Sequence, residues 1–89
     1  MSDGPWRVQF ARRAERDLRR LDPPVRGRVI AGLRRTAERD PSADVKRLTG
    51  QPDLWRLRVG DWRVLFAYDH QGQCIIVTRV LPRGRVYDR

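Results

Sequence analysis

The second half of the chain alternates apolar and polar positions with the two-residue period of β-strands. Over 54–59 the apolar side chains alternate with arginines, and a Gly60-Asp61 turn then leads into a second strand over 62–68. A third strand over 74–81 is almost entirely apolar, as in the centre of a sheet. Since short turns join each strand to the next, the three strands are predicted to form an antiparallel sheet.

The first half begins with a short alternating stretch over 6–10, which predicts a strand, and then changes to helical spacing. One face of the predicted first helix is apolar and consists of Phe10, Ala14, Leu18 and Leu21. Two possible ion pairs with four-residue spacing lie on its polar side, Arg13–Asp17 and Glu15–Arg19. No strong capping residue precedes this helix, so its first residue is left open.

A second helix is predicted after the break at Asp22-Pro23-Pro24. Asp22 is a candidate N-cap, and Pro23 suits the first helical position because its missing N–H is not needed there. The apolar residues of this helix recur four apart, at Val25, Val29, Leu33 and Ala37. The pattern ends near Asp40-Pro41, and the short link between the two helices predicts an antiparallel helical hairpin.

These elements predict an α+β fold with the order β-α-α-β-β-β, in a single domain over residues 1–89. A mainly antiparallel sheet would carry the two-helix hairpin packed on one face. Pro41 to Asp53 is interpreted as a connecting loop.

The net charge of the chain indicates which class of partner it binds. The chain carries 20 Lys+Arg against 11 Asp+Glu, a formal net charge of +9, and Lys46 is the only lysine. The excess is spread along the chain, so a basic folded surface is expected rather than a basic tail. Such a surface suits a polyanion, either nucleic acid or an acidic protein segment.

Several classes of chemistry are not indicated. The single histidine, His70, falls in a predicted turn, so chemistry that needs two histidines is excluded. No His, Cys, Asp or Glu residues show the spacing of metal ligands, so we expect no metal and no cofactor. The single cysteine, Cys74, cannot form an internal disulfide and fits a reducing cytoplasm. Neither a signal peptide nor an apolar run long enough for a membrane helix is visible, so a membrane association is not expected.

Arginine and tyrosine side chains remain as candidates. Arg63 interrupts an apolar strand, and it either binds an anion or pairs with a nearby acid such as Asp61 or Asp69. Arg83 and Tyr87 follow the last strand, where the alternative is a frayed basic tail. Arg56 and Arg58 either extend a basic face or are a solvated strand face, and Lys46 and Arg47 are weaker candidates as loop cations.

The layout resembles the RelE/ParE superfamily of bacterial toxins from toxin–antitoxin modules, over nearly the whole chain. The motifs that carry the resemblance are WRVQF, the A-x-x-x-L-x-x-L pattern from Ala14, VKRLTG, LWRLRVGDWRVLFAYD, and R-x-x-V-Y from Arg83 to Tyr87. The resemblance implies a RelE-like fold and, in the RelE branch, a metal-independent endonuclease that cleaves mRNA in the ribosomal A site. There the ribose 2′-OH attacks the neighbouring phosphate.

The same resemblance implies roles for individual residues. Arg63 would stabilise the phosphorane-like transition state, Arg83 would bind the phosphate or neutralise the leaving group, and Tyr87 would orient or deprotonate the 2′-OH or stack on a base. The residues implied to hold the RNA backbone are Lys46, Arg47, Arg56, Arg58 and Arg85. Where many family members have a histidine before the terminal arginine, this chain has Leu81-Pro82, which leaves Tyr87 as the candidate base.

The resemblance also implies partners and alternatives. A cognate antitoxin would bind the toxin through an acidic, amphipathic segment in a hetero-oligomer, beside the ribosome and mRNA as functional partners. Members of the ParE branch instead inhibit DNA gyrase by protein contact, without catalysis. A third alternative is a toxin that has lost its activity and only binds its antitoxin.

Overall fold

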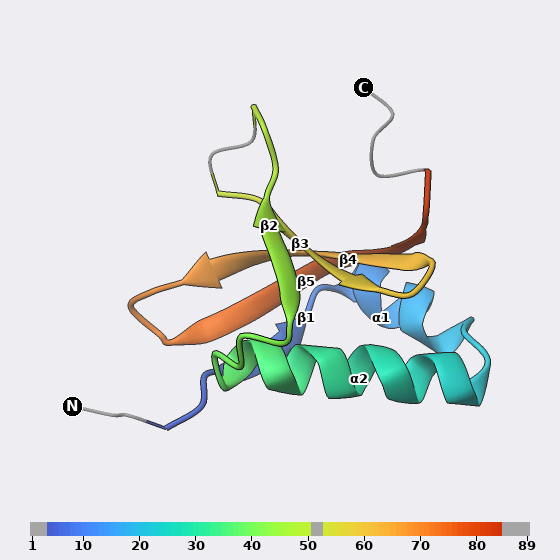
Figure 1. Cartoon of the computed structure of the whole chain (residues 1–89), viewed down its shortest axis with the longest axis horizontal. Coiled ribbons are helices and arrows are strands. Elements are labelled where there is room, and N and C mark those ends of the chain that lie inside the picture. The colour runs from blue at the N-terminus through green and yellow to red at the C-terminus, as the bar shows by residue number, and fades with distance from the viewer. Residues whose placement is uncertain (1–3, 51–52, 85–89) are drawn as a thin grey trace.

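The computed structural model describes residues 4–50 and 53–84, which form one sheet and two helices (Figure 1). The elements are β1 (Arg7–Phe10), α1 (Arg12–Arg19), α2 (Pro23–Ala37), β2 (Asp44–Arg47), β3 (Trp55–Val59), β4 (Trp62–Asp69) and β5 (Cys74–Pro82). Their order in the five-stranded sheet is β1-β5-β4-β3-β2. Strand β1 runs parallel to β5 and every other pair is antiparallel, which confirms the predicted α+β class with a mainly antiparallel sheet.

The expectation of a plain loop between Pro41 and Asp53 is wrong, because this segment contains β2. Strand β2 is four residues long and pairs with β3 in the register Asp44↔Arg58. Val45 is its only apolar residue, so the segment lacks the repeated alternation that reveals a strand in a sequence. The segment is a strand because it pairs with β3, and its own sequence pattern does not predict this. Lys46 and Arg47 are therefore residues of an edge strand.

Both helices cover the same face of the sheet, as the prediction of a helical hairpin on one face requires (Figure 1). The hydrophobic core lies between the two layers. Its buried members are Ala14, Leu21, Val29, Leu33, Ala37, Leu57, Val64, Phe66, Ile75, Val77 and Val80. The four-residue spacing of α2 thus points its apolar side at the sheet, although Ile30 stays 39% exposed.

The start of α2 shows how its two prolines act. Asp22 occupies the N-cap position as predicted, with extended backbone, and the prolines occupy the first helical positions. The Asp22 side chain makes no capping hydrogen bond. Pro24 has no N–H to offer it, which removes one of the two donors that an N-cap side chain normally accepts from.

Glycine brings α2 close to the sheet. A Cβ on Gly32 would lie 3.0 Å from Val59 Cγ2 and 3.2 Å from Leu57 Cδ2, both on β3. Gly27, one and a half turns earlier on the same helix, has nothing within 4 Å of its Cβ position. The two glycines therefore have different consequences for stability, although both weaken the helix by backbone entropy.

Asp17 on α1 holds the edge of β5 beyond the end of β1. Strand β1 ends opposite Val77, so the next part of β5 has no strand on that side, although β4 pairs with it on the other. The Asp17 carboxylate accepts hydrogen bonds from the Val80 N–H at 2.9 Å and from Arg79 Nε at 2.7 Å. One side chain thus takes the place of a neighbouring strand and pairs with a cation from the same segment.

This network determines the ionisation of Asp17. Burial acts to raise its pKa, but the hydrogen bonds from Arg79 and Val80 and the charges of Arg79 and Arg13 outweigh burial, so the pKa lies below its ordinary value. The predicted helical pair with Arg13 is thus a longer-range attraction, whereas the direct partner of Asp17 is Arg79. The other predicted pair, Glu15–Arg19, is present at 3.9 Å on the exposed side of α1.

We expect Asp17→Asn to lower the free energy of unfolding by about 1–3 kcal/mol at pH 7, because it removes a mostly buried, charge-assisted pair. The folded-state pKa is depressed, so this stabilisation is present above the unfolded-state pKa of about 3.9 and is lost as pH falls through the lower folded-state pKa. Urea denaturation at pH 7 and pH 3 measures both values, with the exposed Asp53→Asn as control. An equal loss at both pH values would contradict a role for the ionised carboxylate.

Two alanine substitutions in α2 should have opposite outcomes. Gly27→Ala should raise the free energy of unfolding by about 0.5–1 kcal/mol, since the added methyl meets no neighbour. Gly32→Ala should give no gain or a loss, because the methyl crowds β3 by a few tenths of an ångström. Thermal unfolding of the pair compares them directly, and equal stabilisation would show that α2 does not depend on Gly32 for its packing.

Candidate nucleic-acid interface

The face of the sheet that the helices leave uncovered carries a cluster of arginines. Alternation along β3 and β4 turns Leu57 and Val64 toward the helices and turns Arg56, Arg58 and Arg63 to the other side. We call this side the open face. Its strand register aligns four side chains across the sheet, Asp44 on β2, Arg58 on β3, Arg63 on β4 and Leu81 on β5.

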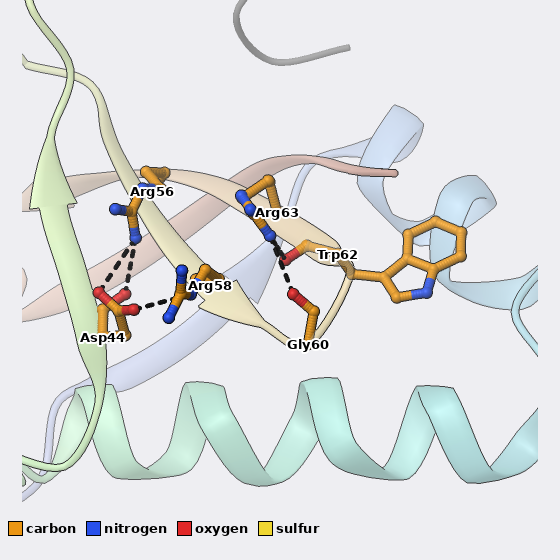
Figure 2. Close-up of polar contacts among 6 residues, drawn as sticks. All are labelled: Asp44, Arg56, Arg58, Gly60, Trp62 and Arg63. Carbon is orange, nitrogen blue, oxygen red and sulfur yellow. Dashed lines mark hydrogen bonds and ion pairs between the residues drawn. The ribbon is translucent and has the colours of Figure 1, made fainter. Parts of the chain in front are cut away.

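Arg63 is buried, with 6% of its surface exposed. Its Nη1 donates hydrogen bonds to the main-chain oxygens of Gly60 at 3.0 Å and Trp62 at 3.1 Å, both at the β3–β4 turn (Figure 2). Its Nε is buried without a hydrogen-bond partner among residues 4–50 and 53–84. The predicted alternative of a pair with Asp61 or Asp69 is not found, because the carbonyls of the turn hold the guanidinium instead.

This arrangement favours an anion at Arg63. Two neutral carbonyls orient the guanidinium but carry no net charge that would neutralise it, and Asp44 attracts it only at longer range. Arg58 lies directly opposite on β3, and like charges at opposite positions of neighbouring strands destabilise each other. An anion that contacted both guanidinium groups would relieve this repulsion and would find one of them already fixed in place.

Asp44 is the carboxylate that compensates the two arginines of β3. Arg56 Nη1 donates to the Asp44 main-chain oxygen at 3.1 Å and to Oδ1 at 3.2 Å, and Arg58 Nε lies 2.9 Å from Oδ2 (Figure 2). The hydrogen bond from Arg56 is the main cause that holds the pKa of the Asp44 carboxyl below its ordinary value. Burial opposes this effect, whereas the charges of Arg56, Arg58 and Arg63 add to it.

The two arginines of β3 differ in access. The Arg56 side chain is 10% exposed and its Nε is buried without a partner, so it faces Asp44 rather than solvent. The Arg58 side chain is 55% exposed and can reach a ligand. The sequence pattern placed both arginines on the polar side of the strand. It could not show that Arg56 is buried against Asp44 whereas Arg58 is exposed to solvent.

The remaining predicted site residues do not all lie on the open face. Arg83 follows β5 and is exposed. Its main-chain N–H donates to the main-chain oxygen of Asp61 at 2.7 Å, which connects the backbone at Arg83 to the turn beside Arg63. Lys46 is exposed on β2 opposite Arg56, on the open face. Alternation along β2 directs Arg47 to the other face. The predicted residues Arg85 and Tyr87 lie outside the described residues.

Sequence reasoning missed Asp44, which the structure places on the edge strand in contact with Arg56 and Arg58. Only the pairing of β2 with β3 brings Asp44 next to Arg58, and a segment with one apolar residue does not reveal that pairing in the sequence. Among residues 4–50 and 53–84, no three His, Cys, Asp or Glu side chains are arranged to hold a metal ion. The arginines of the open face can stabilise negative charge. Neither helix of the described chain is long and apolar enough to cross a membrane.

A second feature lies on the opposite side of the molecule. An apolar groove of about 450 Å³ runs between β1 and α2. Its apolar lining includes Trp6, Val8, Phe10, Ile30, Leu33 and Ala37. Arg34 and Glu38 lie at its margin, so the groove offers apolar contacts next to charged ones.

Comparison with known proteins identifies relatives of the whole chain. Toxin RelE3 of Methanocaldococcus jannaschii is 29% identical, with 92% of this chain and 96% of the relative covered. Toxin RelG of Mycobacterium tuberculosis is 28% identical, with 96% and 99% covered. The structure of the toxin–antitoxin complex RelBE2 from Mycobacterium tuberculosis matches with a TM-score of 0.76 at 28% identity, covering 89% of this chain and 92% of that one.

The fold extends to more distant proteins. The isolated E. coli RelE toxin matches with a TM-score of 0.72 at 20% identity, covering 90% of this chain and 86% of that one, which supports the fold alone. The family model described as ParE toxin of type II toxin-antitoxin system, parDE, matches residues 8–87. The resemblance in the motifs is thereby confirmed, and the chain belongs to the RelE/ParE superfamily of type II toxins, in the family of that model.

Proposed function

We propose that this toxin is a metal-independent endoribonuclease that cleaves mRNA on the ribosome, as the RelE-like resemblance implies. The observation that carries the proposal is Arg63, a buried arginine that backbone carbonyls orient and that forms no direct ion pair within the part of the chain that the structure describes. An arginine held in this way costs little reorganisation when negative charge develops beside it. The exposed Arg58 and Arg83 lie around it at the same end of the sheet.

The proposed reaction needs no group beyond the RNA and the protein. The 2′-oxygen of a ribose forms a bond to the adjacent phosphorus, its proton passes to a base, and the 5′-oxygen of the next nucleotide leaves and is protonated. Charge on the pentacoordinate phosphorus is greatest between these events, and Arg63 and Arg83 would stabilise it. Tyr87 is the proposed base or orienting group for the 2′-OH, since Leu81-Pro82 stands where many relatives have a histidine.

The structure changes the roles proposed for RNA backbone contacts. Lys46 and Arg58 are exposed on the open face and suit phosphate contacts directly. Arg56 is buried against Asp44, so its proposed role is to support the face from within. Arg47, on the other face of the edge strand, would contact ribosomal RNA or mRNA farther from the reacting phosphate, and Arg85 stays a proposed RNA contact.

A cognate antitoxin is the proposed protein partner. Related toxins have been crystallised as complexes with their antitoxins, including RelBE2 of Mycobacterium tuberculosis and RelE–RelB of Pyrococcus horikoshii. The net charge of +9 suits an acidic partner, and the groove between β1 and α2 suits its apolar side chains. A toxin–antitoxin hetero-oligomer in the cytoplasm follows from the proposal.

The second candidate function is inhibition of DNA gyrase by protein contact. It is favoured by the family model, whose description names ParE. The curated relatives named RelE and RelG favour the first function, and the two functions share one fold. A site-directed test is therefore needed to separate them.

Primer extension on a reporter mRNA in a translating extract tests the endonuclease. We expect discrete cleavage within codons that depends on ribosomes, and about a 100- to 1,000-fold loss of cleavage in Arg63→Lys, because an ammonium lacks the guanidinium fork. Arg28→Ala, an exposed arginine on α2, is the matched control and should cleave normally. Intact mRNA with folded wild-type protein, together with inhibited gyrase supercoiling, would support the second function instead.

Arg63→Ala requires a stability measurement beside the activity. The sequence suggests that Arg63 contributes charge more than packing, but the side chain is buried and satisfies two carbonyls of the turn. We expect Arg63→Ala to lower the free energy of unfolding by about 1–3 kcal/mol, in addition to its effect on cleavage. Urea denaturation checks this value, and a folded Arg63→Ala protein with full toxicity would refute the assignment of Arg63 to the site.

A further inference from the structure

The open face holds one carboxylate in contact with arginines that the function requires. Asp44 contacts Arg56 and Arg58 through different oxygens, Oδ1 for the first and Oδ2 for the second. A phosphate presents a similar pair of oxygens, and carboxylate and phosphate are recognised by the same guanidinium donors. Asp44 therefore occupies a donor on Arg58 that an RNA phosphate would use.

We propose that Asp44 is an internal competitor for RNA phosphate at Arg58, which weakens binding of free single-stranded RNA and so determines the selectivity of the open face. The inference rests on the proposed function for the identity of the ligand. It concerns a residue that contacts Arg58 and not the reacting phosphate. Asp44 is thus a specificity-determining residue rather than a catalytic one.

The two contacts of Asp44 differ in how easily they are broken. Arg56 is buried and donates to both the main chain and the side chain of Asp44, so it fixes Asp44 in place. Arg58 and Asp44 have side chains that are 55% and 44% exposed, and such an ion pair is weak because water and salt screen it. An arriving phosphate can therefore displace Oδ2 from Arg58 while Arg56 keeps Oδ1.

This asymmetry has a consequence for selectivity. Arg56 holds the carboxylate beside Arg58 at a high effective concentration, so a ligand with a single phosphate contact gains little by replacing it. A ligand that also engages Arg63 and Arg83 gains enough from those contacts to displace the carboxylate. A basic protein with net charge +9 would otherwise bind any available polyanion.

Fluorescence anisotropy with a labelled single-stranded 2′-O-methyl RNA measures the effect without ribosomes or cleavage. We expect Asp44→Asn to bind this RNA about two- to fivefold more tightly, the range expected from releasing an exposed ion pair. The dependence of log K on log salt should steepen by about 0.7, the value for one additional phosphate contact on a single strand. In an Arg58→Ala background the same change at Asp44 should have no effect.

Glu38→Gln is the control for net charge, because it removes one exposed negative charge at the end of α2, away from the open face. A gain in Asp44→Asn that is absent from Glu38→Gln and from the Arg58→Ala background supports the proposal. An unchanged or weaker affinity, or an equal gain in Glu38→Gln, would overturn it. If Asp44→Asn does not fold, Asp44→Ser provides the same comparison.

The outcome is separable from that of the proposed function. A protein that cleaves no mRNA but shows the Asp44→Asn gain would retain Asp44 as a competitor for phosphate on an inactive toxin. A protein that cleaves mRNA but shows no gain would keep the endonuclease and lose the competitor. Unchanged circular dichroism of each variant confirms that the affinities compare folded proteins.

Discussion

The rest of the structure depends on the coverage of the sheet on one face only. Both helices pack on the side where Leu57, Val64 and Phe66 point, and the close approach of α2 at Gly32 seals that layer. Successive side chains of a strand point to opposite faces, so the residues between these core positions lie on the other face of the sheet. Arginines at alternate positions of β3 and β4 must lie on the uncovered face, so the same register that builds the core also builds the cationic cluster.

The cationic cluster is costly for stability, and the protein compensates for it in two different ways. Arg56 and Arg58 share the carboxylate of Asp44, whereas Arg63 relies on the carbonyls of Gly60 and Trp62. Carbonyls orient a guanidinium but do not neutralise it, so Arg63 keeps a charge that an anion can stabilise. Functional sites commonly retain such unfavourable features, because removing them would improve stability at the expense of activity.

Local patterns predicted the elements that have their own periodicity. The alternation of β3 and β4, the apolar run of β5 and the four-residue spacing of α2 each depend on neighbouring positions, and the structure confirms all of them. Strand β2 was missed because pairing with β3 defines it. Asp17 was assigned a helical partner, but its direct partner, Arg79, is 62 residues away, and no local pattern contains that information. Arg63 was singled out because it interrupts an apolar strand, but its burial and its carbonyl partners required the geometry of the turn.

The two candidate functions make different demands on this face. Inhibition by protein contact requires complementary charge and shape over a surface, and exposed arginines contribute to it roughly in proportion to their number. Stabilisation of a transition state requires a donor held at one position before the substrate arrives. Burying Arg63 and fixing it with two carbonyls removes it from the first use and prepares it for the second. A basic contact surface does not require its central arginine to be buried and fixed, and this is the argument for proposing catalysis rather than contact.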